Sequence, residues 1–121
     1  MKRPAQTCTH GEIMLEKTIE KTLVKAVKTE GGMCPKLISP GTDGMPDRMV
    51  LFSKGCMGFV EVKAPGKKPR PLQSLRHQQL RDLGFKVFVL DEIQQISGVI
   101  QEIRGASDNH TFDEKGECDE A

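Results

Sequence analysis

The spacing of hydrophobic residues changes along the chain, and it predicts the order of the secondary-structure elements. From Glu12 to Thr29 these residues recur at the interval of an amphipathic helix, which Gly31 and Gly32 would end. Short apolar runs bounded by Gly and Pro predict strands. The elements expected after the first helix are strands over 33–39, 47–53 and 57–64, a helix over 72–83, a strand over 85–90, and a last helix capped by Asp91. This α-β-β-β-α-β-α order indicates an α/β fold in which helices flank a mixed sheet.

Length and composition fit one domain. The chain has 121 residues, of which 36% are hydrophobic, enough for a modest core. We expect a flexible leader over 1–11, a domain over 12–104, and an acidic, disordered tail over 105–121. No apolar run approaches the roughly 18 residues needed to span a bilayer, and no signal-peptide pattern is present, which disfavours membrane and secreted proteins. The four cysteines follow no metal-binding spacing, which favours a reduced intracellular compartment.

The net charge of +1 hides an uneven distribution. Residues 106–121 carry six acidic residues against Lys115 alone, whereas the preceding part holds 17 Lys and Arg against 11 Asp and Glu. Between Lys63 and Arg81 there are six basic residues and no acidic one. A positive segment on a compact body favours a polyanionic partner, although charge runs are more often simply solvated surface.

Three charged residues are candidates for chemistry. Residues of a strand alternate between its two faces, so Glu61 and Lys63 point the same way. A hairpin that turns at Gly55 brings Asp47 opposite Lys63, and all three side chains then meet at the strand ends. Two carboxylates in one patch repel each other unless a cation lies between them, and a hard divalent ion with oxygen ligands fits this role. A surface ion pair between Glu61 and Lys63 explains the spacing equally well.

The motifs in this region resemble a known family. Pro46-Asp47 followed by Glu61-Val62-Lys63 reproduces the PD-(D/E)XK nuclease motif, whose superfamily core has the order αβββαβ. More narrowly, the chain resembles the compact stand-alone phage and bacterial members of the virus-type replication–repair nuclease (VRR-NUC) family. This resemblance covers roughly residues 12–100, and its most specific stretches are G-x-P-D-R over 44–48, E-V-K-A-P-G-K over 61–67 and L-Q-x-x-R-H over 72–77.

The resemblance implies a set of site residues. Asp47, Glu61 and the main-chain carbonyl of Val62 match metal ligands, and Lys63 matches the catalytic lysine. The family also has an acidic residue on the first helix, for which Glu16 and Glu20 are both candidates. We favour Glu20, because it lies beside core-facing positions of that helix.

Other residues, some of them on the second predicted helix, are candidates for supporting the site or for binding DNA phosphates. Gln73 opens the helix and matches a family glutamine, either as a support for the site or as a phosphate contact; an ordinary helix N-terminal role is equally consistent. His77, one turn later, could hydrogen-bond a phosphate, although a lone surface histidine is more often incidental. The predicted phosphate-binding set is Lys36, Arg48, Lys67, Lys68, Arg70, Arg76 and His77.

These features predict a DNA endonuclease that uses Mg²⁺, with Mn²⁺ as a substitute, and no organic cofactor. The resemblance implies a homodimer that acts on branched DNA such as four-way junctions. One alternative is a non-catalytic nucleic-acid-binding module on the same fold, and another is a nicking endonuclease on duplex or flap DNA.

Overall fold

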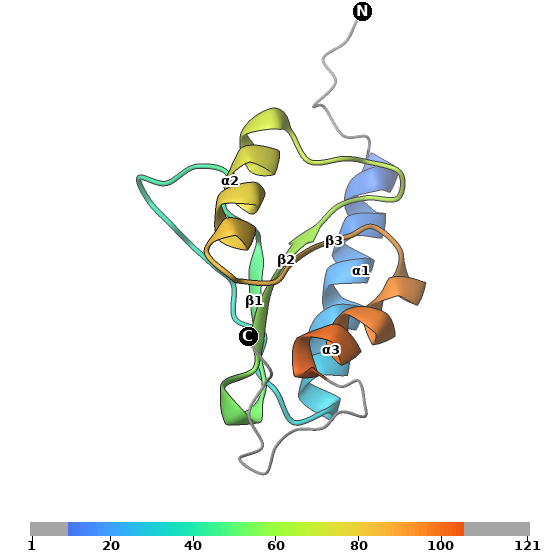
Figure 1. Ribbon diagram of the computed structural model, residues 1–121. Helices are drawn as coiled ribbons and strands as arrows, with labels where there is room; N and C mark the ends of the chain where they lie inside the picture. Colours follow the sequence, from blue (N-terminus) through green and yellow to red (C-terminus); the bar gives the residue numbers. More distant parts are fainter. Residues whose placement is uncertain (1–9, 106–121) are drawn as a thin grey trace, which may run out of the picture.

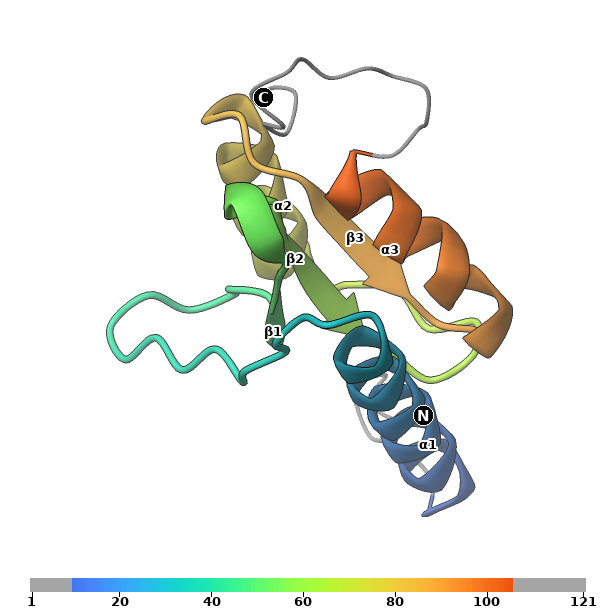
Figure 2. The same ribbon diagram turned by 90° about the horizontal axis from the view of Figure 1, so that it is seen from below.

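The computed structural model describes residues 10–105, which form one mixed sheet flanked by helices (Figure 1). Its elements are α1 (His10–Thr29), β1 (Arg48–Leu51), β2 (Met57–Val62), α2 (Pro71–Asp82), β3 (Val87–Leu90) and α3 (Ile96–Arg104), with 3-10 turns η1 (Ser53–Gly55) and η2 (Ile93–Gln95). The strand order is β1-β2-β3; β1 runs antiparallel and β3 parallel to the central β2. Helices α1 and α3 cover one face of the sheet and α2 lies on the other (Figure 2). The predicted fold class is confirmed.

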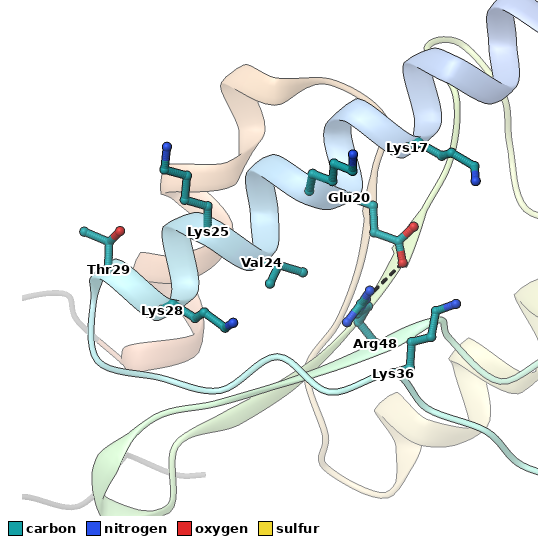
Figure 3. A pocket seen from close by; sticks show the side chains of 9 residues that line it. Lys17, Glu20, Val24, Lys25, Lys28, Thr29, Lys36 and Arg48 are labelled. Atoms are coloured by element: carbon teal, nitrogen blue, oxygen red, sulfur yellow. Dashed lines mark hydrogen bonds and ion pairs between the residues drawn. The ribbon is translucent and has the colours of Figure 1, made fainter.

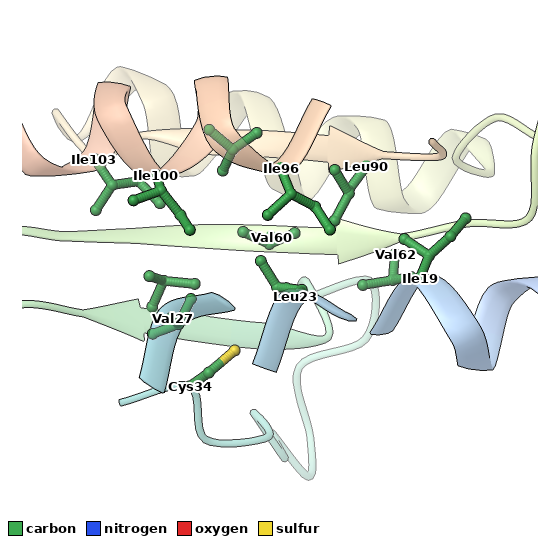
Figure 4. Close-up of a cluster of buried hydrophobic side chains, with 12 residues drawn as sticks. Ile19, Leu23, Val27, Cys34, Val60, Val62, Leu90, Ile96, Ile100 and Ile103 are labelled. Carbon is green, nitrogen blue, oxygen red and sulfur yellow. The ribbon is translucent and has the colours of Figure 1, made fainter. Parts of the chain in front are cut away.

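The apolar core lies between the sheet and the helices α1 and α3 (Figure 4). On α1, Ile19, Leu23 and Val27 recur every four residues, which puts them on one face of the helix. They pack on Val60 and Val62, the residues of β2 that alternate away from Glu61. The same stripes of apolar residues that predicted the helices therefore build this half of the molecule.

The β1–β2 hairpin turns one residue earlier than the sequence suggests. Its register pairs Arg48 with Val60 and so centres the turn on Lys54, which adopts a left-handed backbone with φ of 67°. Continuing this register puts position 47 opposite Glu61, not opposite Lys63, so the predicted pairing is wrong by two residues. A shift by two residues leaves every side chain on its expected face, because the period of a strand is two.

The first predicted strand, over 33–39, is not formed. This segment runs along the outer edge of β1 and makes only two isolated antiparallel bridges, Met33 with Leu51 and Lys36 with Arg48. Pro35 lies between the two bridges and has no N–H for a continuous ladder, although its carbonyl accepts a hydrogen bond from Met49 N–H at 3.0 Å.

The ends of the domain also differ from expectation. Helix α1 begins at His10, inside the predicted leader, while residues 1–9 and the predicted acidic tail beyond Gly105 lie outside the described residues. Asp91 does not cap the last helix; instead, Gln95 Oε1 accepts the Asp91 N–H at 2.9 Å and so closes the turn before α3. Within residues 10–105, no helix has the length and apolar character needed to cross a membrane.

Candidate active site

Asp47, Glu61 and Lys63 meet at one end of the sheet, where β1 begins and β2 ends. Asp47 Oδ2 accepts a hydrogen bond from the Val62 N–H at 2.9 Å, which holds the aspartate across the strand ends. Lys63 Nζ lies 3.3 Å from Glu61 Oε2. The hairpin therefore brings together two carboxylates and an ammonium group that lie up to 16 residues apart in the sequence.

Glu61 is only 1% exposed, and helix α2 covers it. Gln73 Nε2 donates a hydrogen bond to Glu61 Oε2 at 2.9 Å, while Gln73 Oε1 accepts the Arg70 N–H at 2.8 Å. His77, one turn along α2, has its Nε2 3.6 Å from Glu61 Oε1, beyond hydrogen-bonding distance. Glu61 Oε1 and His77 Nε2 are buried without a hydrogen-bond partner. The glutamate is thus fixed through one oxygen, and its other oxygen is unsatisfied.

The charges at the site are unbalanced. Burial raises the pKa of Glu61 to about 7, the negative charge of Asp47 adds to this rise, and Lys63 opposes it. Burial also raises the pKa of Asp47, against the opposing effects of the Val62 N–H and Lys63. Two carboxylates that resist ionisation side by side form an environment in which an added positive charge is strongly stabilised.

Helix α1 contributes the third acidic position. Glu20 Oε2 forms an ion pair with Arg48 Nε at 2.9 Å (Figure 3). Glu16, one turn earlier, has a pKa raised by burial and by the nearby Asp47, and its charge in turn raises the pKa of Glu61. Glu20 acts on Asp47 as well, but its carboxylate is already engaged by the guanidinium of Arg48.

Comparison with known proteins agrees with this geometry. No protein-family model matches the chain. Over 88 residues, covering 73% of this chain and 94% of the relative, it is 46% identical to a protein of Acyrthosiphon pisum secondary endosymbiont phage 1 described as "Putative nuclease p44". A solved structure described as "VRR_NUC domain" matches with a TM-score of 0.67 and 32% identity, over 71% of this chain and 94% of that one. The chain belongs to the VRR-NUC family. It is therefore a nuclease by homology, as the motifs predicted.

VRR-NUC proteins are of the PD-(D/E)XK type, which generally depends on a metal ion. Among residues 10–105, no three His, Cys, Asp or Glu side chains are already arranged so that they could hold a metal ion. The donors present nevertheless fit a hard cation. Such ions take carboxylate and carbonyl oxygens, and Glu61 Oε1 is a buried carboxylate oxygen without a hydrogen-bond partner.

Five of the seven predicted phosphate-binding residues fall into two groups. Lys67, Lys68 and Arg70 lie in the connection between β2 and α2, directly after Lys63. Lys36 and Arg48 form the second group, and both line a groove beside α1. Arg48 is held by Glu20 and also donates to the Cys34 carbonyl at 2.7 Å, so its guanidinium is largely committed within the protein.

Two residues of α2 differ from their expected environment. Arg76 donates to the Asp43 carbonyl at 2.9 Å and to Gln79 Oε1 at 2.8 Å, and so anchors the loop that precedes Asp47. His77 is 2% exposed and so is buried, not a surface histidine, while its contact with phosphate stays a prediction. Burial lowers the pKa of His77, and nearby Arg81 and Lys63 lower it further.

The lysines of α1 were not among the residues that the sequence pattern predicted to bind phosphate. Lys17, Lys21, Lys25 and Lys28 line the same groove as Lys36. Their spacing of three or four residues was visible in the sequence, but only the packing of α1 against the edge of the sheet shows that they share a groove with Lys36 and Arg48.

Proposed function

We propose that this protein is a divalent-metal-dependent DNA endonuclease that hydrolyses phosphodiester bonds. The observation that carries the proposal is the convergence of Asp47, Glu61 and Lys63, in which a buried oxygen of Glu61 has no hydrogen-bond partner within the described protein. A purely structural ion pair between Glu61 and Lys63 would not require a second carboxylate beside it.

The residues have distinct roles in this proposal. Asp47, Glu61 and the Val62 carbonyl would hold the cation, Mg²⁺ or Mn²⁺, and its charge would polarise a phosphate oxygen and a nearby water. The water loses a proton to solvent as its oxygen bonds to phosphorus, and the bond to the leaving sugar oxygen, which takes up a proton from solvent, breaks. Lys63 places its ammonium beside Glu61, where it stabilises the negative charge that builds up on the phosphate. Gln73 orients Glu61 by binding Oε2, which leaves Oε1 for the cation.

For the carboxylate from α1, we infer Glu16 in place of the preferred Glu20. Glu20 is paired with Arg48 at 2.9 Å, whereas Glu16 acts electrostatically on both Asp47 and Glu61. The matched variants Glu16→Gln and Glu20→Gln test this assignment, because each removes one charge from the same helix. Glu16→Gln should raise the Mg²⁺ concentration needed for half-maximal cleavage more than Glu20→Gln does, and the reverse order would restore Glu20 as the ligand.

The basic test is cleavage of labelled DNA with Mg²⁺, with Mn²⁺ or with EDTA. We expect no products in EDTA, and we expect Glu61→Gln and Lys63→Ala to bind DNA without cutting it. The control is Glu102→Gln, which removes an exposed carboxylate of α3 and should cut at the wild-type rate. Cleavage by Glu61→Gln at the wild-type rate would refute the role of Glu61. Binding without products under any divalent ion would instead favour a non-catalytic binding module.

We further propose a homodimer that acts on branched DNA such as four-way junctions. One site cuts one strand, so cleavage of two strands calls for a symmetric pair of sites. Leu72, Leu75 and Leu83 of α2 and its C-terminal end are 43%, 53% and 73% exposed, a surface that a second copy could cover. Cleavage mapping on a four-way junction beside flap and linear duplex controls, combined with a mass measurement in solution, tests both points. A monomer that cuts all three substrates equally would contradict them, and single nicks in duplex or flap DNA would favour a nicking enzyme.

A further inference from the structure

A basic groove of about 540 Å³ runs along α1, beside the candidate active site. Its lining includes Arg48, the apolar Val24 and a single carboxylate, Glu20. It also includes five lysines, which are Lys17, Lys21, Lys25, Lys28 and Lys36. In Figure 3, Lys17, Lys28 and Lys36 surround the ion pair between Glu20 and Arg48. The groove therefore concentrates positive charge around an acidic group that is already neutralised.

The lysines of the groove are not engaged by other parts of the described protein. All five are exposed, and within residues 10–105 none of them forms an ion pair with a carboxylate. Lysine is a strongly hydrated point charge, so a row of lysines without partners does little for the stability of the fold. Such a row instead creates a local positive potential that attracts a polyanion.

Two residues of the groove are close in the chain to residues of the candidate active site. Arg48 directly follows Asp47 in the chain, and Glu20 lies one turn of α1 after Glu16. From Lys17 to Lys28 the helix rises by roughly 16 Å, at about 1.5 Å per residue. Phosphates on one strand of duplex DNA follow each other at about 3.4 Å along the axis, so this length matches about five of them.

We propose that the groove along α1 is a second track for the sugar–phosphate backbone of duplex DNA, which holds the part of the substrate that lies beyond the cut. The inference rests on the proposed function for the identity of the ligand, but it concerns a different surface from the loop over 63–70. The lining includes no aromatic side chain on which a base could stack, so recognition is by charge and independent of sequence.

The experiment measures binding in EDTA, so that it does not depend on cleavage. The full chain and its double variant Lys21→Gln/Lys28→Gln are titrated with a fluorescent 30-base-pair duplex at salt concentrations from 50 to 200 mM. Glutamine has a helix propensity close to that of lysine, so the fold of α1 should be retained. Loss of two phosphate contacts should reduce the slope of log K against log salt by about 2, and the loss of affinity should be about tenfold larger at 50 mM than at 200 mM.

The matched control is Lys54→Gln/Lys86→Gln, which removes the same charge at the opposite end of the sheet, near η1 and the start of β3. It should leave the salt slope close to that of the wild type. Equal slopes for the two double variants would overturn the proposal, because they would show that only net charge matters.

The alternative occupant of the groove is the chain's own acidic segment over 106–121, and DNA binding by a further variant distinguishes the two. A full-length variant with Asn and Gln in place of the acidic residues over 106–121 could bind DNA more tightly than the wild type. If Lys21→Gln/Lys28→Gln then had no effect on DNA binding in that background, the groove would belong to the chain's own acidic segment and the proposal would be wrong. Absence of cleavage under every divalent ion, with the slope still reduced by Lys21→Gln/Lys28→Gln, would refute the proposed nuclease activity and leave this inference standing.

Discussion

Replacing Glu61 with glutamine should stabilise the metal-free protein at neutral and alkaline pH. Burial raises the pKa of Glu61 from an ordinary value of 4.5 to about 7 in the folded protein. Between these two values the folded state holds a proton that the unfolded state has lost. The free energy of unfolding of the wild type therefore falls as the pH rises through this window, and it stays low above pH 7. The amide side chain of the Glu61→Gln variant has no proton to lose there.

The size of the effect follows from the two pKa values. Each pKa difference of one corresponds to 1.36 kcal/mol, so the change from 4.5 to about 7 makes the charged glutamate about 3 kcal/mol less favourable in the fold. Glu61 is 1% exposed, so solvent screening reduces this figure little. The amide of glutamine has the same shape as the carboxyl group and can still accept the hydrogen bond from Gln73 Nε2.

The measurement is urea unfolding in EDTA from pH 4.5 to 8.5, followed by far-UV circular dichroism because the chain has neither Trp nor Tyr. The free energy of unfolding of Glu61→Gln relative to the wild type should increase by about 3 kcal/mol across this range, and that of the exposed-site control Glu102→Gln should increase much less. Saturating Mg²⁺ at pH 8, about 100 times its Kd, should then stabilise the wild type by about 2.7 kcal/mol and the variant far less. A difference between Glu61→Gln and the wild type that does not depend on pH would refute the reasoning.

Three other substitutions, one of them with a matched control, test the surroundings of the site and the core. Gln73→Ala removes a donor to buried Glu61, so the free energy of unfolding should fall by about 1–3 kcal/mol in urea titrations and cleavage should slow; unchanged cleavage would contradict an orienting role. Leu23→Ala opens a cavity at a fully buried position, and the same titrations should show a loss of about 2–5 kcal/mol with α-helical dichroism retained. Gly32→Ala would place a Cβ 2.5 Å from the Leu51 carbonyl, so the free energy of unfolding measured by thermal unfolding should fall by about 1–3 kcal/mol. The Cβ of Gly31→Ser meets no atom within 4 Å, so any loss of stability in that variant should come from backbone strain alone.

The meeting of Asp47 with Glu61 could be predicted from the sequence even though the turn was misplaced. The period of a strand is two, and the true register differs from the expected one by two residues, so both side chains stayed on the expected face. An error of one residue would have put Asp47 on the face of α1 and α3. Lys54 explains the error, because its left-handed backbone takes the place at the centre of the turn that glycine usually fills.

The environment of α2 could not be predicted in the same way. Gln73 and His77 occur in a polar helix whose sequence suggests solvent on every side. They are buried because α2 packs on the face of β2 that carries Glu61, and that contact joins residues 12 and 16 positions apart. The spacing of hydrophobic residues within a helix does not indicate that two of its polar residues are buried against a charged residue of a strand. The preference for Glu20 over Glu16 could not take account of Arg48 for a related reason, because Arg48 reaches Glu20 from the edge strand only in the folded structure.

The two faces of the sheet therefore contribute differently to the molecule. The face under α1 and α3 holds the apolar core, and its residues are those that the hydrophobic pattern identifies. The face under α2 buries Glu61, Gln73 and His77, with two polar atoms unsatisfied, which is an unfavourable arrangement for a domain of this size. Such an arrangement persists in a fold when the surrounding structure holds it in place and when a ligand relieves it. If the proposed function is right, this face is the part of the small domain in which stability is given up for chemistry.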